Sequence, residues 1–294
     1  MVAIPPLPII TADNPKNMPR DITIAVAKEI FQELYQVAAP IAQKRQKWIK
    51  RHRGHDKELR TKVFQFWAQG MTSAPAIVKT CYQEMRRHHN DDDLCFIDND
   101  NWKFYVDIPD HVIDNLGTNF TAFSDLLRVE LLSKFGGVWA DATCYCTQNL
   151  INEFHEMVSP SGFFAFDKGT SNRGLISNWF MASEAGSYPM CLMRELLLLY
   201  WQNYSRPVHY FFFHQFFNLA YQVDKQFRRV ADGAPLLEWD PRVLKSLMLK
   251  KYDREVVNTA LTSSPIHKLT YKIKPTKLNS KTTIAALVRG DGLM

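Results

Sequence analysis

FSDLLRVELLSKFGGVWADATCYC, residues 123–146, is the stretch that decides the fold. Its first half predicts a helix over 123–135, because Leu127, Leu131 and Phe135 recur on one side at intervals of four. The two glycines that follow predict a helix end and a tight turn. The run GVWADATCYC then predicts a strand. We therefore expect a helix that turns directly into a strand.

Polar side chains gather where this helix begins and where the strand continues. Ser124, Asp125 and Arg128 lie near the expected helix start, and the last two, three residues apart, share a face. Asp141 and Thr143 alternate with alanines, so both point to the same side of the strand. The pattern predicts a cradle of carboxylates, hydroxyls and one guanidinium, with Arg128 close to Asp141.

The rest of the chain alternates between short apolar runs and helical periodicity. Strands are expected at 63–67, 94–98, 162–167 and 178–183, and helices at 75–89, 190–204 and 210–221. This alternation predicts an α/β domain built around a mostly parallel sheet. In such sheets ligands bind beyond the carboxyl ends of the strands.

Residues 1–60 differ in composition and residue pattern from residues 61–294, which we expect to form the main domain. Five prolines among the first twenty residues predict an extended arm. The segment that follows, 21–60, predicts a helix interrupted near Pro40. Its second half, from residue 44 onward, is strongly basic and carries Trp48. That half is either a solvated helix face or a contact with an anionic membrane surface or an acceptor.

Composition excludes several classes of protein. Of 294 residues, 46% are hydrophobic and 22% are charged, which excludes a disordered tail, a collagen and a coiled coil. No apolar run approaches the roughly 20 residues of a membrane span. The five cysteines are an odd number without paired spacing, which favours reduced thiols and a cytoplasmic location.

Charge is distributed unevenly along the chain. Residues 1–60 hold 11 Lys and Arg against 6 Asp and Glu, and residues 240–294 hold 11 against 4, whereas residues 61–239 hold 14 against 20. An acidic middle segment argues against a nucleic-acid partner. The basic ends indicate contact with anions, either a membrane surface or a phosphorylated ligand.

The helix–Gly-Gly–strand pattern resembles the donor-sugar region of GT-A glycosyltransferases. The closest resemblance is to the capsular polysaccharide synthesis glycosyltransferases, which are related to the mannosyl- and galactosyltransferases with an Asp-x-Asp sugar-binding motif and to the clostridial glucosylating toxins. The matching residues are Ser124, Asp125, Arg128, Gly136, Gly137, Trp139 and Asp141, with Thr143 at the second acid of the motif. VFQFWAQG (63–70) resembles the family's first strand, and SPIHKLTYK (264–272) resembles its C-terminal His-Lys segment.

This resemblance implies a GT-A domain that moves a hexose from a nucleotide diphosphate sugar to a capsular or other cell-surface glycan, with retention. The acceptor would be an oligosaccharide or a lipid-linked glycan, met in the cytoplasm or at the inner face of the plasma membrane. The implied donor-binding residues are Trp67, Ser124, Asp125, Arg128, Trp139 and Lys268. The implied ligands of Mn²⁺ or Mg²⁺, cations that favour oxygen ligands, are Asp141, Thr143 and His267.

Several alternatives stay open at this point. Ser124 has the residue type of a helix cap, Asp125 and Arg128 that of a surface ion pair, and Trp67 suits a core as well as a base-stacking platform. For a retaining nucleophile, Glu184 and Asp167 are candidates; the alternative is a front-face reaction in which the donor phosphate assists deprotonation of the acceptor. A sugar nucleotidyltransferase, a nucleotide-sugar-binding protein and an RNA- or lipid-surface-binding module are the rival functions.

Overall fold

A five-stranded sheet forms the centre of the computed structural model, which describes residues 20–52, 61–167, 174–273 and 279–290. The strands, in the spatial order β2-β1-β3-β6-β5, are β1 Val63–Phe66, β2 Leu94–Ile97, β3 Gly137–Ala140, β5 Phe163–Asp167 and β6 Ile176–Ser183. β1 pairs in parallel with β2 and β3, whereas β6 is antiparallel to both β3 and β5. Four strands of this sheet therefore run one way and β6 runs the other. The predicted α/β class with a mostly parallel sheet is confirmed.

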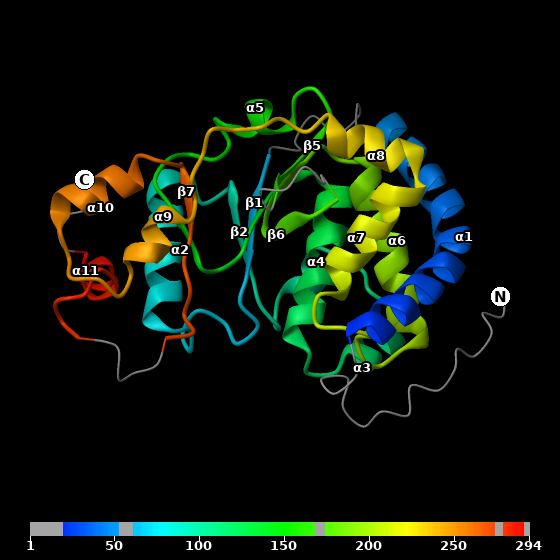
Figure 1. Cartoon of the computed structure of the whole chain (residues 1–294), viewed down its shortest axis with the longest axis horizontal. Helices are drawn as coiled ribbons and strands as arrows, with labels where there is room; N and C mark the ends of the chain where they lie inside the picture. The colour runs from blue at the N-terminus through cyan, green and yellow to red at the C-terminus, as the bar shows by residue number, and fades with distance from the viewer. Residues whose placement is uncertain (1–19, 53–60, 168–173, 274–278, 291–294) are drawn as a thin grey trace.

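Helices cover both faces of this sheet (Figure 1). They are α1 Arg20–His52, α2 Ala76–His88, α3 Asp110–Leu116, α4 Phe120–Lys134, α5 Phe154–Val158, α6 Tyr188–Asn203, α7 Phe212–Val223, α8 Lys225–Asp232, α9 Val243–Leu247, α10 Arg254–Leu261 and α11 Thr283–Arg289. Successive strand residues point to opposite faces. Phe64 and Trp139 accordingly pack with α1, α4, α6 and α7, whereas Val63 and Val138 belong to a second cluster on the other face.

Helix α1 runs without interruption along the outside of α6 (Figure 1), so the predicted break near Pro40 is wrong. A proline inside a helix removes one backbone hydrogen bond and costs about 3 kcal/mol. Pro40 is exposed, while residues such as Phe31, Leu34 and Ala42 on the facing side are buried. Burial of this apolar side offsets the cost. The Pro-rich arm and residues 53–60, where the predicted domain boundary falls, lie outside the described residues.

The strand expected over Gly137–Cys146 is in fact two strands. β3 ends at Ala140, and β4, Cys144–Cys146, pairs instead with β7, Ile266–Lys268, in a second two-stranded sheet. A turn joins them, in which the Cys144 backbone N–H donates to the Asp141 carbonyl at 2.8 Å. Asp141 and Thr143 therefore lie on a turn rather than along a strand.

The glycines before β3 are required by close packing as well as by the turn. Gly136 and Gly137 have φ values of +71° and +94°, which disfavour a side chain. A Cβ at Gly137 would lie 2.4 Å from the Lys62 carbonyl oxygen, and one at Gly136 would lie 2.5 Å from the Ala185 nitrogen. The predicted tight turn is confirmed, and it joins the end of α4 directly to the start of β3.

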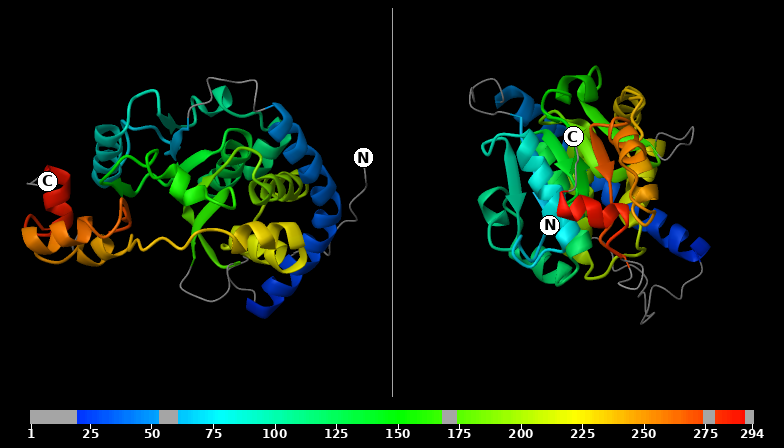
Figure 2. Two further views of the ribbon diagram at one scale, coloured as in Figure 1. Left: turned by 90° about the horizontal axis from the view of Figure 1, so that it is seen from above. Right: turned by 90° about the vertical axis from the view of Figure 1, so that its left-hand side faces the viewer.

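An extended connection crosses the molecule between α8 and α9 (Figure 2). Beyond it, α9, α10 and α11 pack with α2 and β4, and β7 completes the small sheet. Just after β7, the Leu269 backbone N–H donates to the Thr143 carbonyl at 2.9 Å. The chain thus returns to the carboxyl end of β3 more than one hundred residues after leaving it.

Candidate functional site

A polar cluster forms at one edge of the central sheet. β1 and β3 end at this edge, and β6, which runs the opposite way, begins there. Asp141 directly follows β3, and Asn178 lies near the start of β6. Arg128 reaches the cluster from α4, and Lys268 reaches it from β7. This edge is where open α/β sheets bind their ligands.

Helix α4 begins three residues earlier than the sequence predicts. Asn119 is its cap and accepts a hydrogen bond from the Ala122 backbone N–H at 3.1 Å. The interpretation of Ser124 as a possible helix cap is therefore wrong. Ser124 and Asp125 lie in the second turn, where their side chains are close to Arg128 one turn further on.

Arg128 joins the helix to the end of β3. Its Nη2 lies 3.2 Å from Asp141 Oδ1, and its Nη1 contacts Asp125 Oδ1. The side chain of Arg128 is only 3% exposed, and that of Asp125 only 11%. The predicted closeness of Arg128 and Asp141 is confirmed, and the Asp125–Arg128 pair is buried rather than a surface pair.

Lys268 approaches the same carboxylate from the opposite direction. Its Nζ lies 2.7 Å from Asp141 Oδ2 and 2.9 Å from Thr143 Oγ1. The register of the small sheet sets this position, because Lys268 pairs with Cys144, the residue after Thr143. The side chains of Lys268 and Asp141 are 19% and 30% exposed, so this pair opens to solvent more than Arg128 does.

The indole N–H of Trp139 fixes the orientation of the Asp141 carboxylate. Its Nε1–H donates to Asp141 Oδ1 at 3.0 Å, and the Arg128 guanidinium lies 4.8 Å from the centre of its ring. Trp139 itself is completely buried. The prediction that Trp139 touches the donor is therefore not supported by its position. Its role in the site is to orient the carboxylate and the guanidinium.

The two carboxylates of the cluster differ in protonation behaviour. Burial raises the pKa of Asp125 to about 6, a rise that Arg128 opposes only in part. Burial also acts to raise the pKa of Asp141, but Lys268 and Arg128 outweigh it and hold that pKa below its ordinary value. Burial likewise acts to lower the pKa of Lys268, yet Asp141 keeps it raised. Asp141 is therefore ionised between two cations, whereas Asp125 holds its proton to a higher pH than an ordinary aspartate does.

Trp67 lies beside the cluster at the end of β1. It packs against a small apolar cluster of Ala74, Val78 and Ala142, and its ring meets the ring of Tyr271 edge to face at 5.1 Å. Tyr271 is 43% exposed. Trp67 is partly buried. Both interpretations of this residue therefore apply in part: one part of its side chain packs in the core, and the rest is exposed to a flat ligand.

His267 does not join this cluster. Adjacent strand residues point to opposite sides, and His267 is completely buried with its Nε2 3.1 Å from the Leu261 carbonyl oxygen. Burial lowers the pKa of this imidazole. The prediction that His267 is a metal ligand beside Asp141 therefore has no support in the geometry.

The two candidate nucleophiles lie at opposite edges of the sheet. Glu184 follows β6, whose last residue, Ser183, pairs with Gly137 at the beginning of β3. Glu184 is therefore five residue steps, roughly 16 Å, along the strand direction from Asp141, so the prediction of Glu184 as a nucleophile is not supported. Asp167 ends β5 at the same edge as Asp141. The side chain of Asp167 lies outside the described residues.

The site contains residues that the sequence analysis did not single out. Asn178 Nδ2 donates to Asp125 Oδ1 at 2.8 Å, across 53 residues of sequence. Tyr271 packs on Trp67, and Arg242 Nη2 donates to Ser177 Oγ at 2.9 Å. Only Asn178 had a pattern in the sequence that could have indicated a site residue, because it is a polar residue directly before the apolar run WFMA.

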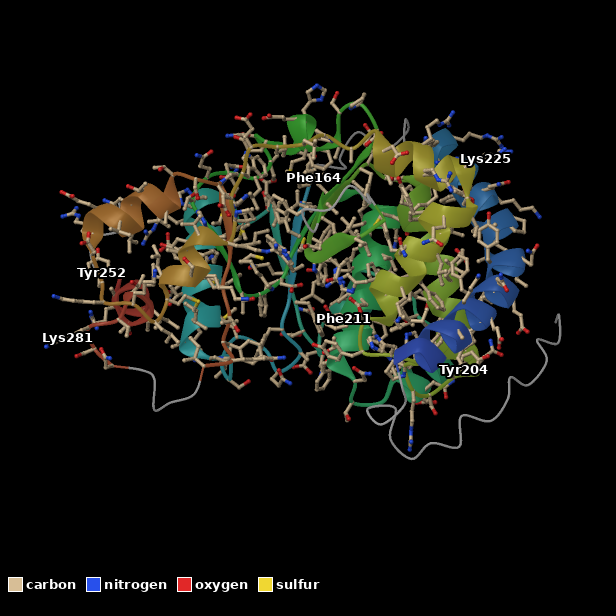
Figure 3. All side chains as sticks on the ribbon, in the orientation of Figure 1. Phe164, Tyr204, Phe211, Lys225, Tyr252 and Lys281 are labelled. Atoms are coloured by element: carbon tan, nitrogen blue, oxygen red, sulfur yellow. The ribbon has the colours of Figure 1, made fainter. Side chains whose placement is uncertain are left out.

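An aromatic pocket of about 220 Å³ adjoins the cluster on the β5–β6 side. Its walls are Phe164, Ala165, Phe166, Trp179, Pro235, Leu236, Leu237, Trp239, Asp240, Pro241 and Arg242. Phe164, labelled in Figure 3, marks the β5 wall. The rings of Phe166 and Trp179 stack at 5.2 Å, and Lys268 Nζ lies 5.7 Å from the centre of the Trp179 ring. Trp179 is therefore a wall shared by the pocket and the polar cluster.

The residues at Asp141 do not fit a divalent metal as they are arranged. Oδ1 of Asp141 accepts from Arg128 and Trp139, and Oδ2 accepts from Lys268, which also occupies Thr143 Oγ1. Within the part of the chain that the structure describes, no three His, Cys, Asp or Glu side chains gather closely enough to share an ion. The positive charge at this carboxylate is supplied by the protein itself, and we assign no step to a metal.

The chain was compared with curated proteins, solved structures and protein-family models. No curated protein and no solved structure matches the chain. One family model does, over residues 16–287, and its description is capsular polysaccharide synthesis protein. That description indicates a biosynthetic role in capsule formation. Because the match spans nearly the whole sequence, polar cluster and aromatic pocket included, the chain belongs to the capsular polysaccharide synthesis protein family.

Proposed function

We propose that this protein is a glycosyltransferase that moves a hexose from a nucleotide diphosphate sugar to a growing capsular glycan. The observation that carries the proposal is the ionised Asp141 held between Arg128 and Lys268 at the carboxyl edge of the sheet. A nucleoside diphosphate leaving group gains negative charge in the transition state. Fixed cations in a partly buried site stabilise such charge more strongly than water does.

The donor would lie along this edge, across the ends of β1 and β3. We assign the base to the aromatic surface of Trp67 and Tyr271, and the diphosphate to Lys268. Asp125, which Asn178 and Arg128 hold in place, would accept hydrogen bonds from sugar or ribose hydroxyls. A carboxylate gives such hydroxyls strong and directional acceptors.

We propose a front-face reaction with retention. The acceptor hydroxyl attacks the anomeric carbon as the bond from that carbon to the phosphate oxygen breaks, and the hydroxyl proton passes to the departing phosphate. This route needs no protein nucleophile, which agrees with the distance of Glu184 from Asp141. Lys268, at the phosphate, would stabilise the charge that develops there.

The acceptor would enter from the other side of Asp141, through the aromatic pocket. Flat rings such as Phe166, Trp179 and Trp239 offer apolar faces to the C–H faces of a sugar, while Arg242 at the rim offers donors to hydroxyls. The strand order places β1 and β6 on opposite sides of β3. Donor base and acceptor sugar are thus assigned to opposite sides of the reacting centre.

We also propose that α1 meets an anionic membrane, where a lipid-linked acceptor would be found. Lys44, Lys47, Trp48 and Arg51 fall on one face of the helix and are all exposed, Trp48 by 62%. Arg45 is not part of this face, because its Nη2 lies 3.9 Å from the buried Glu130. Among the described residues, no helix has both the length and the apolar character to cross a bilayer.

The test is a panel of UDP-, GDP- and CDP-hexoses, measured first by thermal stabilisation and then by mass spectrometry of the products. We expect one donor to raise the melting temperature and to yield a free nucleoside diphosphate. A folded Asp141→Asn variant should lose this turnover. Conversion of the donor only when pyrophosphate is added, to a nucleoside triphosphate and a hexose 1-phosphate, would instead identify a nucleotidyltransferase, and binding without any product would identify a nucleotide-sugar-binding protein.

A further inference from the structure

We infer that the ammonium group of Lys268 takes the place of a divalent cation at the donor diphosphate, so that donor binding does not depend on a metal. The inference rests on the proposed function. Its central observation is that Lys268 Nζ lies 2.7 Å from Asp141 Oδ2 and 2.9 Å from Thr143 Oγ1. Those two atoms are the oxygens that the Asp-x-Thr motif offers to a cation. The site therefore already holds a cation, and that cation is covalently part of the chain.

The other carboxylate oxygen of Asp141, Oδ1, also already accepts hydrogen bonds. Oδ1 accepts from Arg128 Nη2 at 3.2 Å and from Trp139 Nε1 at 3.0 Å. A divalent ion at Asp141 would have to displace an ion-paired donor and would lie beside a second, almost fully buried guanidinium. Like charges in a partly buried site repel strongly. Within the described chain no three His, Cys, Asp or Glu side chains come close enough together to form a metal ligand set.

Lys268 is also the cation that a ligand can reach. Its side chain is 19% exposed, against 3% for Arg128. An ammonium group has three N–H donors, of which Asp141 and Thr143 take two, leaving one for a phosphate oxygen. The backbone fixes the position, because Lys268 pairs with Cys144 in the β4–β7 ladder and its N–H donates to the Pro241 carbonyl at 2.8 Å.

Binding of UDP, GDP and CDP to the full chain, measured by calorimetry in EDTA and in MnCl₂, tests the inference. We expect the diphosphate that binds to have the same Kd within about twofold in both buffers. Lys268→Met should weaken binding about tenfold or more, and Lys268→Arg should retain most of it. Lys245→Met, at an exposed lysine on α9, is the matched control and should bind normally.

A second readout separates a direct role from a structural one. In a folded Lys268→Ala variant, Asp141 Oδ2 and Thr143 Oγ1 lose their shared partner, so Mn²⁺ should restore part of the lost affinity. The inference is overturned if EDTA abolishes binding to the wild-type chain, or if a folded Lys268→Met variant binds as the wild type does. If no diphosphate binds in either buffer, the proposed function itself fails, which is a different result from metal-dependent binding.

Discussion

Arg128 Nη2 lies 3.2 Å from Asp141 Oδ1, although one residue belongs to α4 and the other follows β3. The same guanidinium contacts Asp125, so one buried cation is shared by two carboxylates from two elements. Removing one partner of a buried charge cluster leaves the others without compensation. Arg128 therefore links the stability of the fold to the geometry of the site.

Substitution of Arg128 by Met should lower the free energy of unfolding by about 3 kcal/mol, because Asp125 would remain buried without its cation. Urea denaturation followed by circular dichroism measures this change. Arg87→Met is the control: its side chain is 62% exposed and its pair with Glu84 should contribute less than about 1 kcal/mol. Equal effects of the two substitutions would show that Arg128 is not held as described.

The pH dependence of stability should carry the signature of Asp125. Its pKa is about 6 in the folded chain, above its ordinary value of 3.8, so the folded state holds this proton more tightly than the unfolded state. Stability should accordingly fall as the pH rises from about 4 through 6, since the unfolded state then releases the proton first. Asp125→Asn should remove this fall, on the order of 2 kcal/mol. Denaturation midpoints of both proteins across pH 4 to 8 are the measurement, and parallel curves would contradict the assignment.

Trp239 provides a test of the acceptor pocket that spares the donor side. Its ring faces Phe164 and Phe166 across the pocket at 6.2 Å. Trp239→Ala should raise the KM for the acceptor about tenfold, the loss expected when an aromatic surface worth about 1.4 kcal/mol is removed. Hydrolysis of the donor in the absence of acceptor should stay unchanged. An unaltered acceptor KM would place the acceptor elsewhere.

Membrane binding should depend on the exposed basic face of α1. Reversing Lys44, Lys47 and Arg51 to Glu should release the protein from anionic vesicles, since each basic residue near such a surface contributes roughly 1 kcal/mol. Co-sedimentation with phosphatidylserine-containing vesicles measures this, and added salt should weaken binding of the unmodified chain. Reversal of the exposed pair Lys250 and Lys251 is the control. Retention of the triple variant on the vesicles would refute the proposal.

Much of the fold was predictable because its signals are local. The helix–glycine–strand stretch places Arg128 and Asp141 within thirteen residues of each other, so their closeness follows from short-range geometry. The break after Ala140 was not predictable, because the alternation of residues continues into β4. What ends β3 is a change of pairing partner, from β6 to the distant β7.

Long-range pairing also explains the parts of the site that the sequence did not reveal. Asn178 reaches Asp125 only because β6 inserts beside β3. Glu184 was a plausible nucleophile in the sequence, yet the reversed direction of β6 carries it to the far edge. Pro40 shows the converse: a strong local signal for a break is overridden by the buried apolar side of α1.

The β4–β7 ladder has a consequence for biosynthesis of the protein itself. Lys268 leaves the ribosome 127 residues after Asp141, an interval of roughly 6 to 25 seconds at ordinary rates of translation. Until then the nascent chain contains the helix–glycine–strand stretch but lacks the ammonium that completes it. On the proposed function, the protein would become able to bind a sugar nucleotide only late in translation. A chain truncated before Lys268 would then neither bind nor consume the sugar nucleotides of the cell.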